Sequence, residues 1–415
     1  MTMIIKRDYY LQQLISSKSN NLIKIVTGIR RSGKSFLLFN LFHNHLIETG
    51  ISEDHIIEIA LDDRLNKNLR DPDVILRHIH ERIVDDKLYY IILDEVQMID
   101  EFTDVLNSLL HIRNADVYVT GSNSKFLSKD VVTEFRGRGD EIHLFPLSFA
   151  ELYNSIGGDK FELWKSYYTY GGLPGILELD SEKKKAAYLR SLHETVYLKD
   201  IIERNNLKNS EEFMELMRVM ASCIGSPCNP SKLENTFKSV KNETLDRKTI
   251  SKYLSYMEDA FLIEKSMRYD IKGRKYIGTL SKYYFQDIGL RNALLNFRQV
   301  EENHIMENVI YNELRLRGFC VDVGMVEART AKERKQLEVD FVANMADRRY
   351  YIQSAFAMPD DDKREQECAS LKKIDDSFKK IIIMRDDIKP YHDNNGFYIV
   401  GLMDFLLKPN LIEQL

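Results

Sequence analysis

Residues 28–35 read Gly-Ile-Arg-Arg-Ser-Gly-Lys-Ser, a complete G-x-x-x-x-G-K-[ST] phosphate-binding motif. The apolar stretch before it, residues 22–27, predicts a buried strand, and residues 35–48 carry apolar side chains at helical spacing. A strand, this loop and a helix form the context that makes the motif credible. The glycines let backbone N–H groups turn onto an anion, and the helix N-terminus adds the positive end of its dipole. The stretch therefore predicts an α/β fold with a nucleoside triphosphate on its first loop.

Two residues of the motif have specific expected roles. We expect Lys34 to reach the β- and γ-phosphates of ATP and the Ser35 hydroxyl to ligate Mg²⁺. The remaining nucleotide-binding positions are Gly28, Arg31, Ser32, Gly33 and Phe36. The alternative, a chance match in a glycine-containing turn, is disfavoured because both flanks are correct. The sequence thus predicts ATP and Mg²⁺ as bound groups.

A second apolar strand, residues 89–95, reads Tyr-Tyr-Ile-Ile-Leu-Asp-Glu and ends in two acids. A run of apolar residues is typical of a central parallel strand, and its carboxyl end lies at the sheet edge where phosphates bind. We expect Asp94 to hold the hydration shell of Mg²⁺ and Glu95 to orient and deprotonate the attacking water. Solvated carboxylates in a turn are the alternative. The pair predicts hydrolysis of ATP to ADP and phosphate.

Polar residues follow the third strand, residues 117–120, and two arginines precede the next strand, residues 141–145. Ser122 or Asn123 could touch the γ-phosphate or the lytic water, but turns also favour these residue types. Arg136 or Arg138, of which we select Arg138, could act as an arginine finger on a neighbouring subunit's ATP. A solvated loop is its alternative. The finger would require a homo-oligomer.

Composition narrows the class of protein. The chain has 415 residues, 44% of them hydrophobic and 30% charged, which is ordinary for a globular protein with several domains. The net charge of −5 gives no general basic field, so any contact with DNA must be local. Apolar runs are too short to span a bilayer, and the N-terminus lacks a signal-peptide core. Four Cys without a metal-binding spacing suggest reduced thiols, so we expect a cytoplasmic protein without membrane contact.

The pattern divides the chain into four segments. Residues 1–150 alternate strands and helices, which predicts a parallel sheet covered on both faces. Residues 151–208 are mainly helical, interrupted by Gly-Gly-Leu-Pro-Gly at 171–175, and predict a helical lid or linker. Residues 209–280 predict a winged helix, and residues 281–415 a last α/β domain.

The predicted winged helix consists of helices at 211–223, from Ser231, and at 247–258, followed by a hairpin-like wing around 271–274. In such folds the third helix and the wing often meet DNA. Arg247, Lys248, Ser251 and Lys252 face outward near the start of the third helix. We expect DNA contact near Arg247, Lys248 and Lys252. The alternative is a lid or a protein-docking module without DNA.

The last segment reads as helix 300–317, strands near 320–323, 338–342 and 350–355, helix 361–376 and strand 380–384. This is the core order of restriction-endonuclease-like domains. Asp340 stands at the first metal-binding position, but Gln353 takes the second and Ala355 the place of the lysine. We therefore expect the fold without cleavage, since function resides in the site. A weak metal site from Glu307 and Asp340 is the alternative.

Taken together, these motifs resemble a known family over nearly the whole chain. They are residues 28–35, 93–97, 120–122, 137–138, 146–149 and 170–174 in the first half, and 284–292 and 338–341 in the second. The sequence is similar to prokaryotic AAA+-type ATPases related to the archaeal ATPase family, whose C-terminal half ends in a degenerate nuclease-like fold. The resemblance implies ATP binding with Mg²⁺, hydrolysis and an oligomer. The departures at Gln353 and Ala355 put nuclease activity in doubt.

Three functions are compatible with this sequence. The first is an ATPase that couples its nucleotide state to DNA or protein binding. The second is a nucleotide-gated DNA-binding module with incidental turnover. The third is an ATP-gated nuclease, for which we expect no cleavage.

Overall fold

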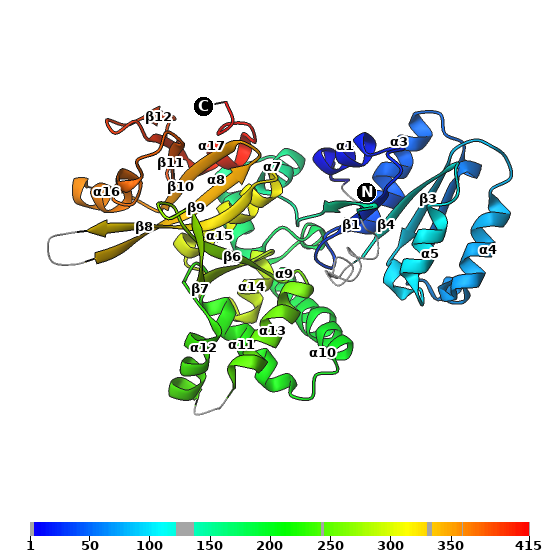
Figure 1. Cartoon of the computed structure of the whole chain (residues 1–415), viewed down its shortest axis with the longest axis horizontal. Helices are drawn as coiled ribbons and strands as arrows, with labels where there is room; N and C mark the ends of the chain where they lie inside the picture. The colour runs from blue at the N-terminus through cyan, green and yellow to red at the C-terminus, as the bar shows by residue number, and fades with distance from the viewer. Residues whose placement is uncertain (1–3, 122–136, 242–244, 330–333, 359, 415) are drawn as a thin grey trace. The chain divides into compact units, whose positions relative to one another are not determined.

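The computed structural model describes residues 4–121, 137–241, 245–329, 334–358 and 360–414 (Figure 1). The chain forms two compact units. The first consists of residues 1–146, 173–178 and 259–261, and the second of residues 147–172, 179–258 and 262–415. The predicted division into four segments stays a prediction.

The first unit is built on a five-stranded sheet in the order β2-β3-β4-β1-β5, with all neighbours parallel. The strands are β1 (Ile23–Thr27), β2 (Ile56–Ala60), β3 (Tyr89–Asp94), β4 (Ala115–Thr120) and β5 (Gly139–His143). Strands β1, β3 and β4 lie where they were expected, and β5 begins and ends two residues earlier than the strand expected at 141–145. Strands β1 and β3 are buried along their whole length. The predicted parallel α/β sheet is confirmed.

Helices cover both faces of this sheet. On one face lie α1 (Asp8–Ser16), α2 (Lys34–Phe36), η1 (Leu37–Phe42) and α3 (His43–Glu48), and on the other α4 (Pro72–Arg82) and α5 (Phe102–Leu109). The unit also has short 3₁₀ helices, which are η2 (Glu53–His55), η3 (Arg64–Arg70), η4 (Val96–Met98) and η6 (Pro174–Ile176). The helix predicted at 35–48 is continuous, with a π-helical stretch at η1. Each face contributes its own apolar cluster, so the sheet is a buried central layer.

The second unit begins with helices, in the segment 151–208 that was predicted to be mainly helical and the residues just before it. They are α7 (Phe149–Ile156), α8 (Lys160–Tyr170), α9 (Glu182–Leu192), η7 (His193–Leu198) and α10 (Lys199–Asn205). A capping box starts α7: the Ser148 side chain accepts from the Glu151 N–H, and the Glu151 carboxylate accepts from the Ser148 N–H. Such reciprocal caps satisfy two backbone donors and fix where a helix begins.

Three helices and a hairpin follow, in the order predicted for a winged helix. They are α11 (Ser210–Ser222), α12 (Pro230–Thr236) continued by η8 (Phe237–Lys241), α13 (Arg247–Asp259), β6 (Ile263–Asp270) and β7 (Lys275–Phe285). The hairpin has a second role that the sequence did not reveal. Strand β6 pairs in parallel with β8 (Cys320–Arg329), so the wing is also the edge of a larger sheet. The boundary predicted at residue 280 falls within β7.

That larger sheet has eight strands in the order β12-β13-β11-β10-β9-β8-β6-β7 and is mixed. Its remaining strands are β9 (Arg334–Met345), β10 (Arg348–Ala355), β11 (Lys379–Met384), β12 (Tyr391–His392) and β13 (Tyr398–Gly401). The helices are α14 (Ile288–Leu294), α15 (Glu302–Leu316), α16 (Asp361–Cys368), η9 (Leu371–Lys373) and α17 (Leu402–Leu407). The order α15, β8, β9, β10, α16, β11 is the predicted one, although α16 ends earlier than residue 376. None of the helices in the described ranges is long and apolar enough to cross a membrane.

Candidate functional site

The loop between β1 and α2 has an unusual backbone. Gly28, Arg31 and Gly33 all have positive φ, at 137°, 65° and 99°. A Cβ atom at Gly28 would lie 2.2 Å from the carbonyl oxygen of Leu144, so no larger residue fits there. Left-handed residues within a loop turn backbone N–H groups to one side and form a concavity for anions. The loop has the backbone that a phosphate site requires.

The Lys34 side chain lies across this loop. Its Nζ atom donates to the carbonyl oxygens of Gly28 (3.0 Å) and Ile29 (3.2 Å), and the residue is only 5% exposed. Burial lowers the pKa of Lys34 to about 8, although the nearby carboxylates of Glu95 and Asp94 act in the opposite direction. The amine is therefore held by neutral carbonyl groups, which phosphate oxygens can replace.

The two acids after β3 are joined to the end of β4 by one hydroxyl group. Thr120 Oγ1 donates to the Asp94 carboxylate and accepts from the Glu95 N–H at 2.8 Å. Burial raises the pKa of Asp94, while hydrogen bonds from Thr120 and Ser35 lower it in part. The structure thus brings together Ser35 and Asp94, the two residues predicted to serve Mg²⁺. Thr120 was missed as a site residue, although it directly precedes the predicted Gly-Ser turn.

Glu95 itself has a left-handed backbone, with φ of 53°. A non-glycine residue in this region costs of order 1–3 kcal/mol and persists only where its surroundings hold it. Its N–H is bound by Thr120, and its carboxylate accepts a hydrogen bond from the Gln97 side chain. Because the backbone is fixed in this way, the Glu95 carboxylate has a defined position beside Asp94.

The other predicted site residues divide into three groups. Ser122, Asn123 and Arg136 lie outside the described residues. Arg138 is described and exposed, and its carbonyl oxygen accepts from the Ile23 N–H at 2.9 Å. Arg31 and Phe36 are also exposed, whereas Ser32 is fully buried. The catalytic and binding roles assigned to these residues stay predictions.

Two residues that were not selected from the sequence lie next to the phosphate-binding loop. The buried Arg7 guanidinium donates to the carbonyl oxygens of Ser32 (3.3 Å) and Phe145 (2.7 Å). Pro174, from the interrupted stretch at 171–175, lies where its Cγ atom would be 3.8 Å from a Cβ atom at Gly33. Neither contact has a local sequence signal, because each joins residues more than twenty positions apart.

Comparisons with known proteins agree with this geometry. A family model described as an AAA domain matches residues 20–153, and one described as a domain of unknown function (DUF8612) matches residues 161–301. An uncharacterized protein of Haemophilus influenzae is 33% identical over 414 residues, which cover 98% of this chain and 99% of the relative. The chain belongs to the AAA+ family of P-loop ATPases.

This AAA+ chain is also similar to a second relative and to a solved structure. An uncharacterized protein of Methanocaldococcus jannaschii is 29% identical over 428 residues, covering 99% of the chain and 89% of the relative. The structure of the Aeropyrum pernix Orc1 protein in complex with DNA is 12% identical, covers 71% of this chain and 93% of that one, and gives a TM-score of 0.32. At this TM-score the likeness carries no information about the partner of the AAA+ chain.

Proposed function

We propose that this chain binds ATP with Mg²⁺ at residues 28–35 and hydrolyses it with Glu95 as the residue that activates water. The observation that carries the proposal is the Thr120 hydroxyl, which bonds to both members of the acid pair. Asp94 is thereby directed towards Ser35, and Glu95 is held in a left-handed backbone beside it. The two acids differ in surroundings, as expected if one serves the metal and the other the water.

The residues present fit both groups. The Ser32 hydroxyl is buried and has no hydrogen-bond partner among the described residues, which marks an unused polar position inside the loop. Ser35 and Asp94 would hold Mg²⁺, which supplies charge neutralisation on the phosphates when bound. Lys34 would exchange its two carbonyl contacts for phosphate oxygens. A charged lysine stabilises the negative charge that develops during transfer.

Glu95 can orient the attacking water and accept its proton, because its carboxylate lies next to the residue that serves the metal. Thr120 acts through Asp94 and Glu95 and is therefore a positioning residue. The proton taken by Glu95 then passes to solvent or phosphate. General-base catalysis of this kind contributes about 10²–10⁴-fold to a rate.

The test compares the wild-type protein with Glu95→Gln, which keeps the shape of the side chain and removes its basicity. We expect ATP hydrolysis to fall at least about 100-fold while the Kd for ATP changes less than about twofold. Glu101→Gln is the matched control, because Glu101 is an exposed acid with the same left-handed backbone (φ of 52°). Hydrolysis by Glu95→Gln at the wild-type rate would contradict the proposal.

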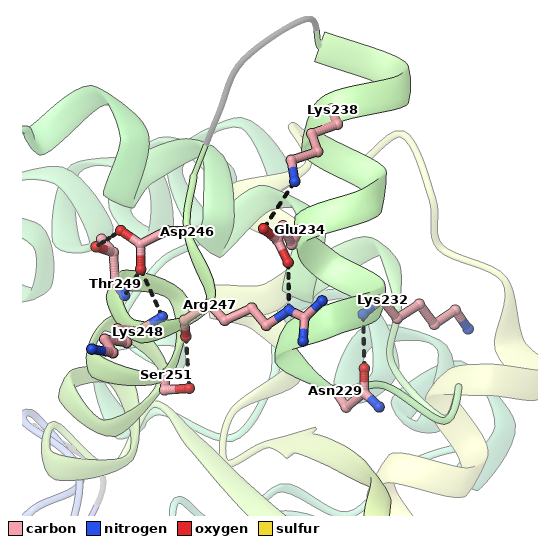
Figure 2. Close-up of polar contacts among 9 residues, drawn as sticks. All are labelled: Asn229, Lys232, Glu234, Lys238, Asp246, Arg247, Lys248, Thr249 and Ser251. Carbon is pink, nitrogen blue, oxygen red and sulfur yellow. Dashed lines mark hydrogen bonds and ion pairs between the residues drawn. The ribbon is translucent and has the colours of Figure 1, made fainter.

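We further infer that the nucleotide state is coupled to binding of double-stranded DNA on helix α13. As expected, Arg247, Lys248 and Lys252 are exposed near the start of this helix. Asp246 caps the helix by accepting from the backbone N–H groups of Lys248 (2.8 Å) and Thr249 (3.1 Å), as Figure 2 shows. Basic side chains at the start of the third helix of a winged helix are placed to contact DNA phosphates.

Glu234 on α12 pairs with two basic side chains beside the start of α13, where DNA is proposed to bind. Its carboxylate accepts from Arg247 Nε at 2.5 Å and from Lys238 Nζ at 2.9 Å (Figure 2). These partners lower the pKa of Glu234, so it stays ionised and offsets one positive charge. The net positive charge of these residues is therefore small, which predicts moderate affinity with a modest dependence on salt, because the slope grows with the number of phosphate contacts.

The test measures binding of a fluorescent DNA duplex by anisotropy with no nucleotide, with ADP, and with ATP on the Glu95→Gln protein. Combined substitution of Arg247, Lys248 and Lys252 by Ala should weaken binding at least about tenfold and reduce the salt slope by about two to three. The matched control replaces three exposed basic residues of α9, Lys183, Lys184 and Arg190, by Ala. Equal affinity in all nucleotide states would exclude coupling, because a ligand without differential affinity shifts no equilibrium. Failure to bind DNA would leave a protein as the partner.

A further inference from the structure

A buried lysine in the second unit is surrounded by carboxylates. Lys282, on β7, is 2% exposed, and its Nζ atom lies 2.8 Å from Glu307 Oε1, 2.8 Å from Glu338 Oε1 and 3.8 Å from Asp340 Oδ1. Glu307 comes from α15, and the other two acids from β9. Two elements, α15 and β9, therefore place their acids around an ammonium group that a third element, β7, supplies.

Other groups of the protein also bind to Glu307 and Asp340. Tyr284 donates its hydroxyl to Glu307 Oε1 at 2.7 Å, and the Ser354 N–H donates to Asp340 Oδ2 at 2.8 Å. The second oxygen of Glu307 faces the turn after α11, where a Cβ atom at Gly225 (φ of 70°) would lie only 2.9 Å away. Glu307 and Asp340 thus have further partners within the unit, whereas Glu338 is partly exposed, at 30%.

The charges of the cluster favour a permanent cation at its centre. Burial alone would lower the pKa of Lys282, but Glu307, Asp340 and Glu338 together raise it above its usual value. Burial and the neighbouring Glu307 raise the pKa of Asp340, while Lys282 opposes this shift. An ammonium group is a compact point charge with three donors, which suits a position among several carboxylates.

We propose that the Lys282 ammonium occupies the position where the acids of a metal-dependent nuclease-like centre would hold a divalent cation, so this centre takes no metal. The framework of such a centre is present in Glu307 and Asp340. The position expected for its lysine is filled by Ala355, which is buried. Across the described ranges, no group of three or more His, Cys, Asp or Glu side chains is placed to hold a metal ion. The unit supplies its own cation instead.

The competing interpretation is that Lys282 replaces the missing lysine of an active nuclease. That interpretation requires a metal ion to bind beside Lys282 in the wild-type protein, because such centres clamp the phosphate with metal ions. The contacts argue against it. Glu307 Oε1 already accepts from both Lys282 and Tyr284, and the second metal position is held by Gln353, a neutral carboxamide.

The experiment titrates Mn²⁺ alone, without nucleotide, into the full-length protein by calorimetry. For the wild-type protein we expect no uptake that depends on Asp340, judged against Asp340→Asn. Uptake lost in Asp340→Asn would overturn the proposal, as would plasmid cleavage that requires Asp340. This comparison stands on its own if the lysine variant does not fold.

The second arm uses Lys282→Met, which removes the ammonium group and leaves the three acids. We expect this variant to bind about one Mn²⁺ and its Tm to rise by at least about 3 °C in saturating Mn²⁺, because a ligand of the folded state stabilises it. The combined variant Lys282→Met with Asp340→Asn should lose both effects. If folded Lys282→Met takes up no Mn²⁺, the cation position has been assigned wrongly. Neither arm depends on ATP hydrolysis by the first unit.

Discussion

Two of the buried lysines, Lys34 in the first unit and Lys282 in the second, have opposite surroundings. Lys34 is held by two neutral carbonyl oxygens, and burial lowers its pKa to about 8. Lys282 is held by carboxylates, which raise its pKa. A lysine bound only by carbonyl groups can exchange them for phosphate oxygens, whereas a lysine paired with acids has its charge already compensated. The difference distinguishes a site for a ligand from a site filled by the protein itself.

The largest effect is expected at Lys282. Replacement by Met leaves the buried Asp340 and the partly buried Glu307 and Glu338 without their cation. Removing one partner of a buried ion pair costs about 3–5 kcal/mol. Urea unfolding followed by circular dichroism measures the loss. Lys265→Met, an exposed lysine on the neighbouring strand β6, is the control and should change stability by less than about 0.5 kcal/mol. If both variants are equally stable, Lys282 is not the counterion of these acids and the comparison fails.

Lys34→Ala should weaken ATP binding without lowering the stability of the fold. We expect ATP affinity to fall at least about 100-fold, because charge-assisted hydrogen bonds contribute about 1.5–3 kcal/mol each. The free energy of unfolding without nucleotide should change little, since the lysine gives up only carbonyl contacts. Isothermal calorimetry and urea unfolding separate the two effects, with exposed Lys67→Ala as control. A large loss of stability with unchanged ATP binding would reverse the assignment of the two lysines.

Thr120→Val tests the acids beside Lys34 at nearly constant volume. It removes the hydroxyl that bonds to Asp94 and to the Glu95 N–H, leaving the latter unsatisfied at a cost of about 1–3 kcal/mol. We expect kcat for ATP hydrolysis to fall about tenfold with KM nearly constant, because the residue positions groups that act in the transition state. An unchanged kcat would show that Glu95 is held without Thr120.

The smallest expected effect is the dependence of ATP affinity on pH. The pKa of Lys34 is about 8 in the protein and 10.5 in its ordinary environment, so the folded site loses its proton first as pH rises. Phosphate requires the charged form, and ATP affinity should therefore weaken about eightfold between pH 7.5 and pH 9. The charge of Lys282 should be retained over this range. Calorimetry at both pH values measures the change, and constant ATP affinity would show that Lys34 is not the titrating group.

The features that could be predicted from the sequence are those set by residues close together along the chain. The phosphate loop, the strand that ends at Asp94 and Glu95, and the order of elements in both halves follow from local patterns of apolar and polar residues. The cluster around Lys282 does not, because β7, α15 and β9 meet only through sheet pairing and helix packing. Arg7 was missed for the same reason, since its partners Ser32 and Phe145 are far from it in the sequence. The expectation of no cleavage rests on the identity of Gln353 and Ala355 and stays a prediction, and the structure adds that Lys282 pairs with Glu307 and Glu338.

The hairpin of β6 and β7 limits how this part of the chain can be exchanged between proteins during evolution. It follows α13 as a wing, and it also pairs with β8 as the edge of the eight-stranded sheet. Removing the chain after residue 280 would cut β7 and separate β6 from its parallel neighbour. A hairpin alone is marginally stable at best in water. Helix α13, which carries Arg247 and Lys248, therefore cannot be exchanged between proteins as a separate module together with its wing. Any change in what it binds must arise by substitution within this same unit.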